Sequence, residues 1–201
     1  IGLVHEAGKA EVDAAVQAAR AALKGEWGRL SVNRRVELLY AVADEINRRF
    51  DDFLAAADWL KTNRYTSTEK LAIAGGSNGG LLVGAALTQK PDQFGAVICS
   101  VPLLDMLRYH QFLVARFWVP EYGSSEKPDQ CKLLHAYSPH HHVTKGVKYP
   151  AVLFVTGDSD TRVDPLHARK MTALMQASTR SARPGVLRYD TNIPHSRGEP
   201  V

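Results

Sequence analysis

A serine, an acid-rich segment and a late histidine follow one another in an order that suits nucleophilic catalysis. Gly75-Gly76-Ser77-Asn78-Gly79 fits the pattern G-x-S-x-G, in which a strand turns sharply into a helix and carries the serine at its tip. Small residues suit such a turn, and a Cβ on either flanking glycine is expected to collide with the strand or the helix. The pattern favours Ser77 as a nucleophile over an ordinary tight turn, which stays open as the alternative.

A serine hydroxyl is nearly inert until a base takes its proton, so a carboxylate and an imidazole should follow. The apolar run at 151–157 ends in three acids, Asp158, Asp160 and Asp164. Asp158 can cap the turn and Asp164, before Pro165, is typical of a helix N-cap, so the pattern favours Asp160 as the acid.

The candidate base is His195, which stands 35 residues beyond Asp160 in "TNIPHSRG". Taken alone, a histidine in a polar tail is a surface residue, but its distance behind both partners predicts a loop that brings the imidazole between them. The start of the helix after Ser77 supplies unpaired N–H groups, and that of Asn78 is the candidate oxyanion donor.

The elements that position these residues form an α/β pattern. Short apolar runs at 71–74, 96–101 and 151–157 predict buried parallel strands, and 186–191 predicts a weaker fourth. Helical patterns at 79–89 and 164–177 and a variable stretch at 102–149 lie between them. This alternation predicts a parallel sheet with right-handed crossovers.

The first sixty residues predict helix instead. An apolar stripe with spacings of three and four runs through Val32, Val36, Leu39, Ala43, Ile46, Phe50, Phe53, Ala57 and Leu60. It fits one long helix, or two helices broken near Asp51 and Asp52. Either way the segment predicts a helical hairpin whose seam is covered within the chain or by another copy of it.

Composition excludes several classes of protein. The 201 residues carry a formal charge of +4, but the basic residues are scattered, so no nucleic-acid partner is expected. No apolar run approaches the roughly 18 residues that span a membrane, and a cytoplasmic location is expected. Cys99 and Cys131 lie far apart, which argues against a disulfide scaffold or zinc ribbon. The run His140–His142 is not expected to bind one metal ion, because consecutive side chains point in different directions.

From about residue 50 onward the chain resembles the carboxyl-terminal catalytic region of the prolyl oligopeptidase family of serine peptidases. The segments that carry the resemblance are "FDDFLAAADWL", "YTSTEKLAIAGGSNGGLLVGAALTQKPDQFGAVICSVPLLDMLRYHQF", "YSPHHHV", "YPAVLFVTGDSDTRVDPLHARK" and "PHSRG". The resemblance implies a triad of Ser77, Asp160 and His195. It also implies that Arg162 holds a substrate carbonyl, and that Trp118, Tyr122 and Val163 line a pocket for a proline-like ring.

About residues 1–57 resemble the amino-terminal helical segment of aldehyde dehydrogenases, and the two resemblances overlap in "FDDFLAAA". That family's nucleotide-binding glycines and nucleophilic cysteine have no counterpart in this chain, so no cofactor is implied. We therefore expect a helical hairpin at 1–60, resembling aldehyde dehydrogenase, and at 61–201 a truncated α/β-hydrolase fold of about four parallel strands.

The expected function is that of a serine hydrolase that forms an acyl-enzyme. The family's β-propeller and the tyrosine that supplies its second oxyanion donor have no counterpart here, which favours small carboxylic esters over peptides cleaved after proline. The alternative is a catalytically dead remnant whose helical hairpin drives self-association. In both cases a homo-oligomer, a dimer or larger, is expected, because the edge of the nucleophile strand needs a cover.

Overall fold

The computed structural model describes residues 17, 29 and 51–195. The chain divides into two compact units at residues 45 and 46, and the architecture below belongs to the second. The predicted boundary between residues 60 and 61 stays a prediction, and most of the predicted hairpin lies outside the described residues. Residues 51–60 of the predicted hairpin lie in a helix that runs from 51 to 62. Within the described ranges, no helix has the length and apolar character needed to cross a membrane.

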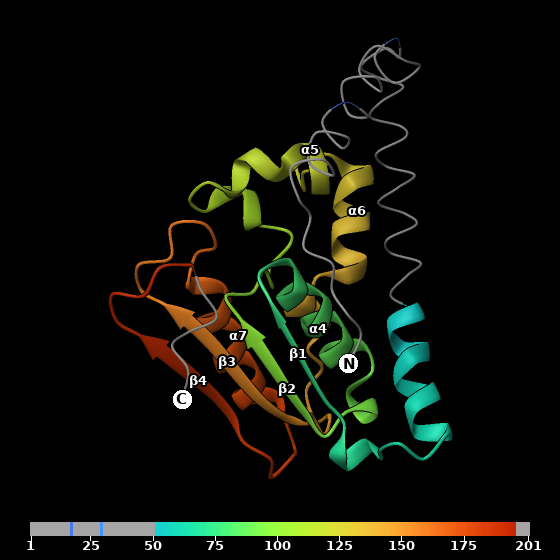
Figure 1. The fold of residues 1–201 in the computed structure, drawn as a ribbon. Helices are drawn as coiled ribbons and strands as arrows, with labels where there is room; N and C mark the ends of the chain where they lie inside the picture. The colour runs from blue at the N-terminus through green and yellow to red at the C-terminus, as the bar shows by residue number, and fades with distance from the viewer. Residues whose placement is uncertain (1–16, 18–28, 30–50, 196–201) are drawn as a thin grey trace. The chain divides into compact units, whose positions relative to one another are not determined.

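Four parallel strands form one sheet in the described part of the chain, in the order β1-β2-β3-β4 (Figure 1). The strands are β1 (Ala72–Gly76), β2 (Ala96–Ser100), β3 (Ala151–Gly157) and β4 (Gly185–Asp190). Each falls on an apolar run that predicted it, because a strand covered by helices needs apolar side chains. The prediction of an α/β fold with about four parallel strands is confirmed.

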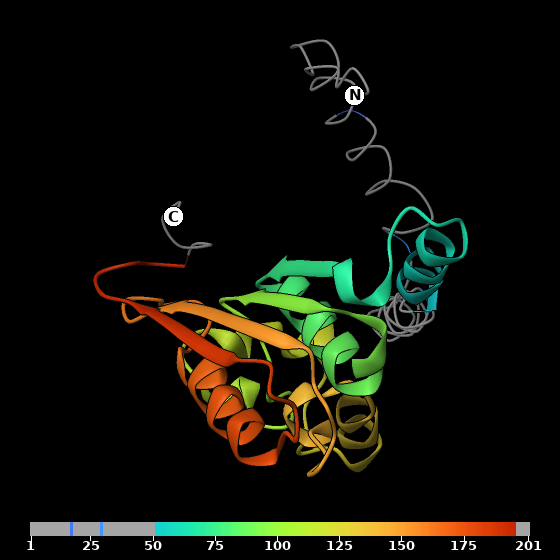
Figure 2. The ribbon, with the colours of Figure 1, turned by 90° about the horizontal axis from the view of Figure 1, so that it is seen from below.

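Two helices join these strands, α4 (Asn78–Gln89) after β1 and α7 (Leu166–Ser178) after β3. Both lie on the same side of the sheet (Figure 2). The core on that side contains Ile73, Val97 and Val152, which are paired in register across β1, β2 and β3. The helix at 51–62 adds Ala57 to this core. The sheet is therefore held to its helices by one continuous apolar layer.

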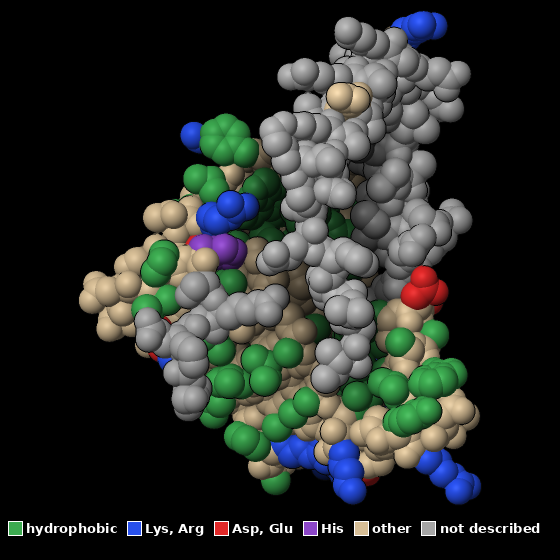
Figure 3. Space-filling view, viewed as in Figure 1, with side chains coloured by type: hydrophobic (Ala, Val, Ile, Leu, Met, Phe, Trp, Pro, Cys, Tyr) green, Lys and Arg blue, Asp and Glu red, His purple; other side chains and the backbone are tan. Residues whose placement is uncertain are grey.

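The opposite face of the sheet remains open to solvent at several apolar positions. Ala74 pairs with Ile98, and Val186 lies in the same row on β4. Ile98 is 40% exposed and Val186 is 45% exposed. Hydrophobic side chains accordingly gather on the face seen in Figure 3. Parallel sheets are normally covered on both faces. The described helices cover this sheet on one face only.

The stretch 102–149, for which the sequence predicts no particular structure, folds into short elements stacked beyond the carboxyl ends of the strands. They are η3 (Tyr109–Gln111), η4 (Ala115–Trp118), α5 (Val119–Tyr122), α6 (Pro128–Tyr137) and η5 (Pro139–His142). A second apolar cluster forms here around Met106, Tyr109 and Leu134. The remaining short turns are η1 (Thr68–Lys70) and η2 (Pro91–Gln93).

Candidate active site

Ser77 stands on a strained turn between β1 and α4. Its φ of 57° lies in the left-handed region, which a residue with a side chain adopts only when its surroundings impose it. The backbone fixes this conformation from both sides: Ser77 N–H donates to the carbonyl of Ser100 at 2.9 Å, and Leu81 N–H donates to the carbonyl of Ser77 at 3.2 Å. The hydroxyl is thereby raised at the carboxyl end of the sheet.

Two glycines around Ser77 are sterically required, but they are not the two that the sequence pattern indicates. A Cβ on Gly75 would lie 2.1 Å from the carbonyl oxygen of Gly79, and one on Gly80 would lie 2.7 Å from Cβ of Pro102. A Cβ on Gly79, however, would meet nothing within 4 Å. The expectation that both flanking glycines are sterically required is therefore wrong for Gly79, because this residue faces open space at the start of α4.

Asp160 is buried in the loop after β3, where its carboxylate is fully hydrogen-bonded. Oδ1 accepts the backbone N–H groups of Arg162 and Val163, each at 2.9 Å. Oδ2 lies 2.7 Å from Nδ1 of His195. Asp164 instead accepts the N–H of Leu166, the first residue of α7, at 2.8 Å. The neighbouring acids therefore hold the backbone, while Asp160 faces the imidazole.

His195 joins the other two residues into one row. Its Nε2 lies 3.0 Å from Oγ of Ser77, and its side chain is 18% exposed. With Nδ1–H donated to Asp160, Nε2 presents its lone pair to the serine hydroxyl. The row is a nucleophile, a base and an orienting carboxylate at hydrogen-bond distances, an arrangement suited to acyl transfer.

The loop that carries His195 is attached to β3. The N–H of Asp158 donates to the carbonyl of Asp190 at 3.0 Å, and the Asp158 carboxylate accepts the N–H of Asn192 at 2.7 Å. A Cβ on Gly157 would lie 2.1 Å from the carbonyl oxygen of Ile193, so the loop passes directly over the end of the strand. The sequence alone does not reveal this close approach, since the glycine at 157 there indicates only a turn.

The residues predicted to line a pocket gather beside the row. Val163 is buried in the second apolar cluster, and Trp118 and Tyr122 pack against that cluster half-buried. Arg162 is exposed, and its backbone N–H rather than its side chain is tied to Asp160. The structure thus brings the three predicted pocket residues into one cluster and leaves Arg162, the predicted carbonyl contact, exposed.

Tyr122 makes a contact that the sequence did not predict. Its hydroxyl donates to Oδ1 of Asn78 at 3.0 Å, which connects the pocket to the residue after the nucleophile. Burial, and secondarily the charge of Glu121, raises the pKa of Tyr122 to about 12, so the phenol keeps its proton and can donate. The predicted oxyanion donor therefore belongs to a residue whose side chain is anchored.

Cys99 lies behind the elbow, fully buried in β2, with Sγ 3.3 Å from the carbonyl oxygen of Gly80. Burial raises the pKa of its thiol, so the sulfur stays protonated. Cys131 is half-buried in α6, and both cysteines are free. Neither thiol is part of the hydrogen-bonded row.

Comparison with known proteins gives a consistent result. Residues 43–200 match the prolyl oligopeptidase family, and residues 1–73 match the aldehyde dehydrogenase family. A prolyl endopeptidase from Elizabethkingia miricola is 41% identical over 150 residues, which cover 74% of this chain and 21% of that protein.

Solved structures agree in both fold and sequence. A structure from a study of two prolyl endopeptidases is 55% identical, with a TM-score of 0.73 over 76% of this chain and 22% of that one. A post-proline cleaving enzyme from Rickettsia typhi is 39% identical, with a TM-score of 0.70 over 73% of this chain and 21% of that one. The chain thus spans about a fifth of the length of the relatives it matches.

Proposed function

Because the chain belongs to the prolyl oligopeptidase family of serine peptidases, we propose that Ser77, His195 and Asp160 form its catalytic triad. The observation that carries the proposal is the hydrogen-bonded row from Ser77 Oγ through His195 to Asp160, at 3.0 and 2.7 Å. The α/β-hydrolase sheet positions this row, because all three residues follow the carboxyl ends of parallel strands.

The reaction begins with proton transfer from Ser77 Oγ to His195 Nε2 while Oγ attacks the substrate carbonyl. Asp160 fixes the tautomer of His195 and stabilises the imidazolium that forms. The imidazolium then protonates the leaving group. The leaving group departs, and the acyl group remains bound to Ser77 Oγ. A water molecule deprotonated by the same imidazole attacks this acyl-enzyme, and the proton returns to Ser77 as the acid departs.

The substrate class proposed is small carboxylic esters, with residual cleavage of peptides after proline. Asn78 N–H is the proposed oxyanion donor, at the start of α4 where backbone N–H groups have no intrahelical acceptor. Losing one donor of an oxyanion hole costs about 10²–10³ in rate. An amide, with its poor leaving group, suffers more from a single donor than an activated ester does.

The pocket proposed for a proline-like ring consists of Trp118, Tyr122 and Val163, which lie together beside the row. Arg162, exposed at the same loop, is proposed to contact a substrate carbonyl. Apolar side chains with one cationic neighbour suit an acyl group that carries a ring and a second carbonyl.

The decisive experiment compares wild type, Ser77→Ala and Ser159→Ala on p-nitrophenyl esters from acetate to octanoate, with a proline-dipeptide anilide in parallel. Ser159 is an exposed serine whose hydroxyl bonds to Asp158 at 2.8 Å, so it is the matched control. Ser77→Ala should lose at least about 10³-fold in rate, and Ser159→Ala should keep the wild-type rate.

A fluorophosphonate probe tests the assembled triad independently of substrate choice. One label per chain, absent in Ser77→Ala, is the expected result. A folded wild-type chain that neither labels nor turns over esters would overturn the proposal and favour the non-catalytic remnant. The predicted homo-oligomer stays a prediction, which light scattering on the eluting protein would measure.

A further inference from the structure

A buried carboxylate away from the row keeps one oxygen unused. Asp105, in the loop after β2, is 1% exposed. Its Oδ2 accepts Nε of Arg108 at 2.8 Å and is also bonded by the ammonium of Lys170. Its Oδ1 is buried and has no hydrogen-bond partner in the described part of the chain. An ionised oxygen that has lost its water and gained no donor is costly, so this atom requires a cation or a proton.

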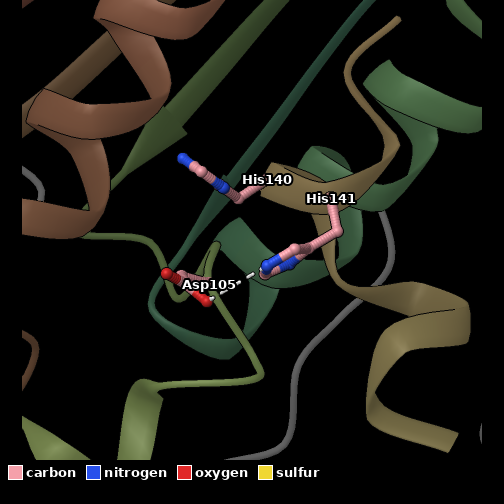
Figure 4. Close-up of side chains that lie close together, drawn as sticks. All are labelled: Asp105, His140 and His141. Atoms are coloured by element: carbon pink, nitrogen blue, oxygen red, sulfur yellow. Dashed lines mark ion pairs between the residues drawn. The ribbon is translucent and has the colours of Figure 1, made fainter. Parts of the chain in front are cut away.

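Two imidazoles of η5 lie near this carboxylate. Nε2 of His141 is 3.8 Å from Oδ1 of Asp105. One ligand atom each from Asp105, His140 and His141 fall within 4.8 Å of one another. Figure 4 shows His141 turned toward the carboxylate, and His140 on the same turn. The backbone holds this approach, because His140 N–H donates to the carbonyl of Leu104 at 2.8 Å.

Ser138 positions the ring of His141 behind this contact. Its Oγ accepts the Met106 N–H at 3.0 Å and lies 2.8 Å from Nδ1 of His141. In the tautomer in which Nδ1 donates to that oxygen, Nε2 presents a lone pair to Oδ1 of Asp105, 3.8 Å away, and a metal ion between them accepts both.

We propose that Asp105, His140 and His141 bind a Zn²⁺ ion that ties the loop after β2 to η5. Imidazole nitrogen and carboxylate oxygen are ligands that Zn²⁺ prefers, at about 2.0–2.2 Å from the metal. Two ligand atoms of a tetrahedral site then lie about 3.3 Å apart, so the 3.8 Å separation of Oδ1 and Nε2 needs little closure. His140 must approach further, and a water or small anion takes the fourth position.

Two of the three ligands have hydrogen-bond partners that orient them, as the side chains behind zinc ligands commonly do. Ser138 holds Nδ1 of His141, and Arg108 holds the far oxygen of Asp105. The positive charges of Arg108 and Lys170 repel Zn²⁺. The effect of removing one of them therefore tests the proposal. Lys170 has a side chain 23% exposed, so its ammonium can retreat into water, and its removal should strengthen zinc binding.

His142 supplies a matched control within the same run of histidines. Its Nδ1 lies 3.0 Å from the backbone carbonyl oxygen of Ser138, and its ring lies 5.5 Å from that of His135, tilted by 48°. A flexible histidine-rich loop that binds metal adventitiously would use His142 as readily as its neighbours. The proposed site uses His140 and His141 only.

The test is a Zn²⁺ titration of the tag-free full chain, stripped with a chelator, in competition with a chromophoric zinc indicator. The variants are His140→Gln, His141→Gln, His142→Gln and Lys170→Gln. Wild type should bind one Zn²⁺ per chain. His140→Gln and His141→Gln should each weaken binding by at least about tenfold, with no change in His142→Gln. Lys170→Gln should tighten binding by about fivefold or more.

Substituting Co²⁺ gives a second readout, because a tetrahedral site has visible absorption bands that His141→Gln should abolish. Absence of zinc binding by wild type would overturn the proposal. So would a loss in His142→Gln equal to that in His141→Gln. If a histidine variant fails to fold, the Lys170→Gln affinity decides: unchanged or weaker binding overturns the proposal, and tighter binding supports it.

Discussion

Two buried carboxylates of this protein face imidazoles, and they are satisfied in opposite ways. Asp160 has its Oδ1 bonded by two backbone N–H groups and its Oδ2 by His195 at 2.7 Å. Asp105 accepts Arg108 and Lys170 on the same oxygen, Oδ2, while His141 stays 3.8 Å from Oδ1. The first oxygen of Asp160 is hydrogen-bonded by neutral backbone donors. Asp105 is bonded by two cationic side chains on one oxygen, and its other oxygen has no hydrogen-bond donor in the described part of the chain.

The difference shows what each environment can do. Neutral backbone donors fix the direction of the Asp160 carboxylate without adding charge. Its second oxygen is therefore left to interact with the imidazole of His195. At Asp105 the charges are balanced by side chains that are partly in water, so the site can exchange one cation for another. The first arrangement suits proton transfer, and the second suits ion binding.

The largest expected effect comes from replacing the carboxylate of Asp160. Asp160→Asn keeps the shape but presents a poorer acceptor to Nδ1–H of His195, which favours the wrong tautomer. We expect the rate of ester hydrolysis to fall by about 10³–10⁴. Steady-state kinetics and the fluorophosphonate labelling rate measure it. Equal rates in Asp160→Asn and wild type would show that Asp160 plays no part in the chemistry.

The next effect comes from displacing the imidazole while leaving the carboxylate intact. Gly157→Ala places a Cβ 2.1 Å from the carbonyl oxygen of Ile193 and must push the His195 loop away. A shift of about 1 Å in a catalytic group can cost about 10² in rate. Gly185→Ala is the control, since a Cβ there meets nothing within 4 Å. The prediction fails if both variants hydrolyse esters equally fast.

Removing the charge at Asp105 is expected to act on stability. Asp105→Asn leaves Lys170 and Arg108 without their anion, but both side chains reach water, so the free energy of unfolding should fall by only about 1–3 kcal/mol. Urea denaturation in the presence of a chelator measures it. Asp129→Asn, a change at an exposed acid of α6, is the control and should alter stability by less than about 0.5 kcal/mol. A stable Asp105→Asn protein would contradict the ion-pair account.

The smallest effect concerns the anchor of Asn78. Tyr122→Phe removes the hydrogen bond to Asn78 Oδ1 and should lower the ester rate by about fivefold. Because the pKa of Tyr122 is raised to about 12, the phenol stays protonated and donates at every pH well below that value. The ratio of wild-type to mutant rate should therefore stay constant from neutral pH to about 10. Tyr65→Phe, at a side chain 71% exposed, is the control.

The sequence predicts the parts of this protein that depend on local pattern. Continuous apolar runs define three of the strands, a weaker pattern at 186–191 indicates the fourth, and the Gly-rich turn after β1 identifies Ser77. It does not predict the stretch 102–149, because its short turns are fixed by distant contacts, such as Tyr109 OH to the carbonyl of Gly123 at 2.5 Å. The pairing of Asp105 with His141 is invisible for the same reason, since 36 residues and no shared motif separate them.

The hydrogen bond between Ser77 and His195 joins positions 118 residues apart. Its two ends can meet only after β2 and β3 have been inserted between β1 and β4, since the strands lie in sequence order across the sheet. Long-range contacts of this kind form late in folding, because closing a long loop costs entropy before any contact repays it. Reactivity toward a phosphonate therefore reports the final step of folding. When the denatured chain is diluted into buffer, this reactivity should recover later than the helical circular dichroism signal.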